Sequence, residues 1–96
     1  MASSSASEGR IAPRETETRA RNERIAGSAR RHHFDRAAPV PFLCECSNRA
    51  CEALLRITLD EYRLTRAAAD FLVAPGHQVD HARIVRVRDA VWLYRA

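Results

Sequence analysis

The stretch FLCECSNRACEALLRITL, residues Phe42–Leu59, decides how this chain folds. It holds all three cysteines of the chain, and Cys44, Cys46 and Cys51 fall within eight residues. Residues two apart on a regular strand point to the same face, so the first two thiols are expected to lie side by side. The turn-forming residues 47–48 allow the chain to bend and to bring the third thiol back toward them. We therefore expect a hairpin whose turn gathers three sulfur atoms.

The residues after the last cysteine predict a strand and then a helix. Segment 53–59 alternates between apolar and polar side chains, which is typical of a half-buried strand. Thr58 and Glu61 have the spacing of a capping box, which marks a helix start. We expect this helix to cover about residues 59–69.

The remaining elements are expected to be short strands. One strand at 41–45 leads to the thiols, and another at 71–73 ends at Pro75-Gly76. The last pattern is a hairpin with arms at 84–87 and 91–94. With a helix before the first strand, this order predicts an α+β fold with a small antiparallel sheet and one or two helices.

The N-terminal part differs in composition from the rest of the chain. Residues 1–36 are rich in Ser, Arg and Glu, and predict a flexible leader with a marginal helix at about 15–31. Residues 37–96 carry most of the apolar side chains and are expected to form the folded domain. A domain of about 60 residues is marginally stable and often needs a disulfide, a metal or a partner.

The clustered cysteines predict a structural zinc site. Such sites use four cysteine or histidine ligands, so one histidine is needed. His77 ranks first because the Pro-Gly turn before it fixes its direction, and His81 ranks second. Water or one of the leader histidines, His32 and His33, is the remaining choice. The sequence thus predicts a zinc-ribbon-like, metal-stapled mini-domain with four ligands: Cys44, Cys46, Cys51 and His77.

Three other interpretations of the cysteines stay open at this stage. The thiols can be small buried hydrophobic side chains without a metal. Three cysteines and a histidine can also hold a two-iron, two-sulfur cluster. A C-x-C pair can form a strained, reducible disulfide, which would make the site a redox-sensitive switch.

The motifs resemble those of a group of short, uncharacterised bacterial proteins, mostly actinobacterial. The shared pattern is F-x-C-E-C-x4-C, then L-T-x-x-E-Y, then F-x-V-x-P-G-H, often after R-x-N-E-R-I. Here these elements are Phe42–Cys51, Ile57–Tyr62 and Phe71–His77, with a partial match that ends at Ile25. The resemblance implies that the three cysteines and His77 belong to one unit. It implies no activity.

Charge and cysteine content limit the function classes. All 16 basic residues are arginine, and the net charge of +4 comes mainly from the leader, so the folded part is nearly neutral. Three cysteines cannot all pair within one chain, and no apolar signal follows Met1, so we expect a cytoplasmic protein.

These observations favour a binding or regulatory module without catalysis that docks on a protein partner. A nucleic-acid-binding zinc protein is the alternative, using the Arg-rich leader and the face of the last hairpin that carries Arg86 and Arg88. An enzyme is the least favoured class, with Glu45, Asp80 or His81 as its acid or base.

Overall fold

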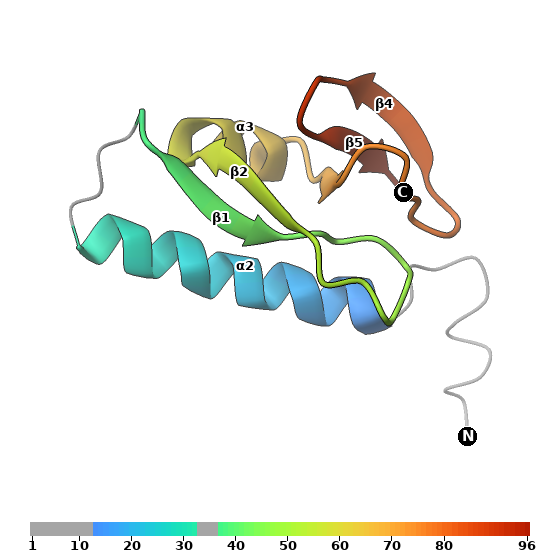
Figure 1. Cartoon of the computed structure of the whole chain (residues 1–96), viewed down its shortest axis with the longest axis horizontal. Coiled ribbons are helices and arrows are strands. Elements are labelled where there is room, and N and C mark those ends of the chain that lie inside the picture. Colours follow the sequence, from blue (N-terminus) through green and yellow to red (C-terminus); the bar gives the residue numbers. More distant parts are fainter. Residues whose placement is uncertain (1–12, 33–36) are drawn as a thin grey trace.

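The structure is a computed structural model that describes residues 13–32 and 37–96. Within these residues the chain forms helix, two strands, helix and three strands, which confirms the predicted α+β fold (Figure 1). The elements are α2 (Pro13–Arg31), β1 (Pro39–Leu43), β2 (Leu54–Thr58), α3 (Leu59–Ala67), β3 (Phe71–Val73), β4 (Arg83–Val87) and β5 (Trp92–Arg95).

The strands form two antiparallel sheets instead of the single sheet that the sequence suggested. Strands β1 and β2 form one hairpin, and the second sheet has the order β3-β5-β4. Helix α3 follows β2 directly, so it carries the chain away from the first hairpin before β3 begins. The loop between β1 and β2 holds the cysteines and lies beside the N-terminal end of α2 (Figure 1).

Strand β1 accommodates two prolines because it is an edge strand. Pro39 and Pro41 pair with Thr58 and Arg56 in the β1–β2 register. They are two residues apart, so their nitrogens, which cannot donate, face the open edge together. Leu43 is the next residue in this series, and its backbone N–H donates to the side chain of Asn22 at 2.8 Å. The edge of β1 thus ends against helix α2.

The predicted start of helix α3 is confirmed by its cap. The Thr58 hydroxyl accepts from the Glu61 backbone N–H at 3.1 Å, and the Glu61 carboxylate accepts from the Thr58 backbone N–H at 2.9 Å. The two contacts satisfy backbone donors that lack partners in the first turn of a helix.

Helix α2 (Pro13–Arg31) lies where the sequence predicts a marginal helix at about 15–31, and one of its faces is buried against the rest of the domain. Its buried residues follow helical spacing along one face, which packs against the rest of the domain: Glu15, Thr18, Asn22, Ala26 and Ala29. The boundary predicted between residues 36 and 37 therefore separates α2 from a core to which it contributes. The predictions for residues 1–12 and 33–36 lie outside the described residues.

Two clusters of buried side chains form the core. The first joins both helices to the β1–β2 hairpin and includes Phe42 and Tyr62, whose rings stack with centroids 4.4 Å apart. The second lies under the β3-β5-β4 sheet and includes Cys44, Cys46, Phe71, Val73, Val79 and Tyr94. Two of the three thiols are therefore part of the second cluster.

Candidate metal centre

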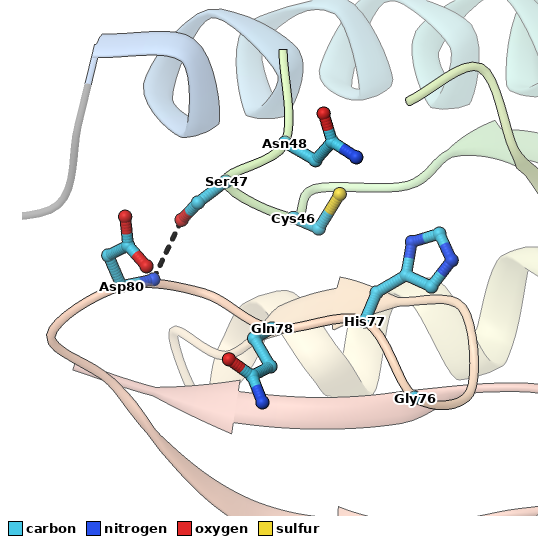
Figure 2. A pocket seen from close by; sticks show the side chains of 7 residues that line it. All are labelled: Cys46, Ser47, Asn48, Gly76, His77, Gln78 and Asp80. Atoms are coloured by element: carbon cyan, nitrogen blue, oxygen red, sulfur yellow. Dashed lines mark hydrogen bonds between the residues drawn. The ribbon is translucent and has the colours of Figure 1, made fainter. Parts of the chain in front are cut away.

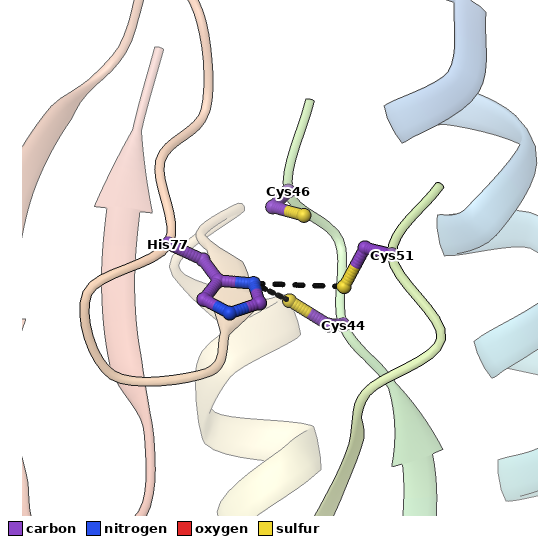
Figure 3. A group of neighbouring side chains, drawn as sticks. All are labelled: Cys44, Cys46, Cys51 and His77. Carbon is purple, nitrogen blue, oxygen red and sulfur yellow. Dashed lines mark hydrogen bonds between the residues drawn. The ribbon is translucent and has the colours of Figure 1, made fainter. Parts of the chain in front are cut away.

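The structure brings the four predicted ligands together. The three sulfur atoms and a ring nitrogen of His77 all lie within 4.8 Å of one another. The thiols come from the loop between β1 and β2, and the imidazole comes from the loop after β3 (Figure 3). The set that holds these atoms is Cys44, Cys46, Cys51 and His77. These residues are positioned to bind a metal ion.

A tight turn directs His77 toward the thiols. Its backbone N–H donates to the Ala74 carbonyl at 3.0 Å, with Pro75 and Gly76 between them. Gly76 has a φ of +86°, the left-handed conformation that the third residue of a type II turn requires. Proline at the second position fixes the preceding part of the turn. The Pro-Gly pair thus sets the side-chain direction that the sequence suggested.

The distances fit a tetrahedral zinc site. Zn–S bonds of about 2.3 Å and a Zn–N bond of about 2.0–2.1 Å place sulfur and nitrogen about 3.5 Å apart. The Nδ1 atom of His77 lies 3.5 Å from the Sγ atom of Cys44 and 3.5 Å from that of Cys51. One ion between these atoms would have ordinary bond lengths to them.

Burial raises the pKa of two of the three thiols. It raises the pKa of Cys44 to about 12, although backbone N–H donors, Ala74 foremost, act in the opposite direction. Burial also raises the pKa of Cys46. At Cys51 burial acts upward too, but the backbone hydrogen bond from Ala53, the other thiols and the charge of Arg14 together lower the pKa. Metal binding would therefore have to displace protons from Cys44 and Cys46.

Backbone hydrogen bonds fasten the cysteine loop, residues 44–53, to the segment that carries His77. The Glu45 N–H donates to the Leu72 carbonyl at 2.8 Å, and the Ser47 N–H donates to the Gln78 carbonyl at 2.9 Å. The Ala74 N–H donates to Cys44 Sγ at 3.2 Å. These contacts hold the two ligand-bearing segments in register.

Glu45 is the centre of a buried polar network behind the thiols. Its carboxylate accepts from Asn22 Nδ2 at 2.8 Å, from the Leu72 N–H at 3.0 Å and from both terminal nitrogens of Arg66. Burial lowers the pKa of Arg66, but the Glu45 carboxylate outweighs it and raises the pKa above its usual range. Arg66 also approaches Glu23 of α2, with 3.4 Å between Nε and Oε2. The residue between the two buried cysteines therefore ties α2, α3 and β3 together.

Sequence reasoning missed the contribution of helix α2 to this site. The Arg14 guanidinium donates to the backbone carbonyls of all three cysteines, at 3.3 Å for Cys44 and for Cys51. The next residue, Glu15, accepts from the Ser47 hydroxyl. The sequence indicated a role for this helix only through the partial R-x-N-E-R-I match, which lies further along α2.

The metal centre borders an open pocket of about 420 Å³. Cys46 and His77 lie on its wall, and the rest of the lining is largely polar: Ser47, Asn48, Gly76, Gln78 and Asp80 (Figure 2). The Ser47 hydroxyl also accepts from the Asp80 N–H at 2.7 Å. One side of the site is thus accessible to solvent and to small molecules.

The other predicted site residues lie elsewhere. His81 and His32 are exposed, and neither belongs to the ligand group; His33 is outside the described residues. The Glu45 carboxylate is fully buried in its network, so it does not face the pocket. Of the residues considered for an acid or base, Asp80 alone lines that pocket.

No protein-family model, curated protein or solved structure matches this chain. The resemblance to the bacterial group stays a prediction. No helix in the described part of the chain is both long and apolar enough to cross a membrane.

Proposed function

We propose that the four clustered side chains hold one structural zinc ion, and that the domain is a zinc-stabilised binding or regulatory module of the cytoplasm without catalysis. The convergence of four ligand atoms within 4.8 Å carries this proposal. Bound zinc would join the cysteine loop to the loop after β3, across a small core. Structural zinc contributes roughly 10–16 kcal/mol in small peptides, which is comparable to the whole stability of a domain.

A single ion fits the site better than an iron–sulfur cluster. A two-iron cluster places its two ligand pairs on opposite irons, so the pairs must stand well apart. Here the ligand atoms all lie within one small group, and both S···N distances of 3.5 Å match a single tetrahedral ion.

The geometry favours a structural role over a catalytic one. A catalytic zinc keeps one coordination position for water or substrate and has an acid or base nearby. Four protein ligands would fill the tetrahedron here. Glu45, the acidic residue between Cys44 and Cys46, already accepts hydrogen bonds from Asn22, Arg66 and Leu72.

A groove between α3 and the β3-β5-β4 sheet supports a protein partner. Its volume is about 430 Å³, and its apolar lining includes Val91, Leu93 and Leu64, the last with 72% of its surface exposed. An exposed apolar side chain beside a groove of mixed apolar and charged lining supports a protein-binding surface.

The arginines around this groove favour protein over nucleic acid. Arg88 pairs with Glu61 at 3.2 Å, and Arg95 pairs with Asp70 at 2.7 Å. Carboxylates thus neutralise two guanidiniums that phosphate would otherwise contact. A fluorescein-labelled DNA duplex should therefore bind weakly, and a tight complex that loses several decades of affinity between about 50 and 200 mM salt would favour the nucleic-acid alternative.

Native mass spectrometry of the purified chain tests the zinc proposal. We expect one zinc ion per chain, lost in His77→Ala together with the folded state. His81→Ala is the matched control, because it removes an exposed histidine from the same loop region. This variant should keep its zinc and its folded state. A folded His77→Ala protein with its full zinc content would refute the proposed ligand set.

A further inference from the structure

The first turn of α2 contacts the cysteine loop at each residue that carries a ligand. Arg14 Nη1 donates to the carbonyls of Cys44 and Cys46, and Nη2 donates to the carbonyl of Cys51 at 3.3 Å. Three carbonyls converge on one guanidinium because the loop curves around the point where the thiols meet. Arg14 therefore recognises the loop in the shape that gathers the ligands.

A guanidinium suits this position better than any other cationic group. It is planar and offers five N–H donors in a fixed fork, so it can reach several carbonyls at once. It also carries a positive charge beside three thiols, and three thiolates with one imidazole on a divalent ion leave a net charge of −1. An ammonium would supply the charge but not the same set of directed hydrogen bonds.

Two further residues of α2 extend this recognition of the cysteine loop. Asn22 lies two turns after Arg14, accepts from the Leu43 N–H and donates to the Leu43 carbonyl and to the Glu45 carboxylate. Glu15 accepts from the Ser47 hydroxyl. The contacts of α2 with residues 43–51 thus bracket Cys44 and Cys46 on both sides.

The docked face of α2 has little hydrophobic surface of its own. Its buried apolar residues are Ala26 and Ala29, with Ile25 partly buried beside them, while the other buried positions are the polar Glu15, Thr18 and Asn22. Small side chains contribute little free energy on burial. Docking of residues 14–22 of the helix therefore depends on polar partners in residues 43–51, and these partners are in place only when that segment has its folded shape.

We propose that Arg14 is a positioning residue of the metal site, and that metal binding and docking of helix α2 stabilise each other. This inference rests on the proposed zinc site. The coupling between zinc binding and helix docking is reciprocal. If docking of α2 through Arg14 raises the affinity for zinc, bound zinc must favour docking of α2 by the same factor. Substitution of a residue that holds the ligands of a metal site in place commonly lowers metal affinity by about 10- to 100-fold.

The test measures zinc transfer from the full chain to a chromogenic chelator, with hydrogen exchange followed in parallel. We expect Arg14→Ala to speed zinc transfer by about tenfold or more. Zinc transfer from Arg14→Lys should be slower than from Arg14→Ala but faster than from the unmodified chain. Added methylguanidinium should slow zinc transfer from Arg14→Ala. Arg21→Ala is the control, because Arg21 is exposed on the same helix. It should behave like the unmodified chain and should not respond to methylguanidinium.

Hydrogen exchange of the unmodified chain gives a second readout that needs no variant. Chelation should remove protection from amides in residues 13–31 at least as early as from the β3-β5-β4 sheet. Equal zinc transfer from Arg14→Ala and Arg21→Ala would overturn the proposal, as would full protection of α2 after chelation. A chain that never binds zinc would instead refute the metal site itself, so the two failures are distinguishable.

Discussion

The side-chain amide of Asn22 lies 2.8 Å from the carboxylate of Glu45, and this contact joins helix α2 to the residue between two clustered thiols. Both side chains are fully buried. A buried carboxylate is stable only when hydrogen bonds and an opposite charge compensate for lost hydration, and Arg66 and the Leu72 N–H complete that set. Glu45 is thus a structural residue that anchors the cysteine loop.

Replacing Glu45 with Gln should lower the free energy of unfolding of the zinc-loaded protein by about 3 kcal/mol, because the charge of Arg66 would lose its buried partner. Urea unfolding of the zinc-loaded chain measures the change. Glu52→Gln removes an exposed charge from the same loop and should have an effect within about 0.5 kcal/mol. Equal stability of the two variants would show that the network does not support the fold.

The cap of α3 gives a smaller and separate prediction. Thr58→Ala should lower the free energy of unfolding by about 1 kcal/mol, because the Glu61 N–H loses its side-chain acceptor. Thr16→Ala, an exposed threonine in α2, provides the comparison. Zinc content should stay unchanged in both, since neither residue belongs to the ligand group. A zinc-poor Thr58→Ala protein would mean that the cap also supports the site.

Zinc affinity should rise with pH. The raised pKa values of Cys44 and Cys46, with Cys44 at about 12, keep both thiols protonated in the metal-free protein near pH 7. Zinc binding must displace these protons, and the lowered pKa of Cys51 adds less. Titration calorimetry in buffers of different ionisation enthalpy should therefore show about two to three protons released per zinc at neutral pH. Release of fewer than about one proton would mean that the buried sulfurs do not ionise on binding.

The sequence was informative where local chemistry is specific. The C-x-C-x4-C spacing, the capping box and the Pro-Gly turn each depend on a few neighbouring residues, and each appears in the structure as expected. The turn before His77 allowed the imidazole to be chosen among four histidines, because backbone geometry at Gly76 restricts the direction of the next side chain.

The role of α2 was hidden because its buried face is mostly polar. Glu15, Thr18 and Asn22 have helical spacing, but a search for apolar periodicity finds only a thin stripe of Ile25 and alanines. Their burial depends on partners far along the chain, such as Ser47 and Leu43. Likewise, the separation of the strands into two sheets depends on where α3 carries the chain, which no short motif encodes.

X-ray absorption at the zinc edge of the purified protein tests the central claim most directly. A Cys3His site predicts three sulfur neighbours at about 2.3 Å and one nitrogen at about 2.0–2.1 Å. The His81→Ala control should keep both shells, because His81 is exposed and lies outside the ligand group. A first shell of oxygen and nitrogen with no sulfur, or iron as the bound metal, would contradict the account.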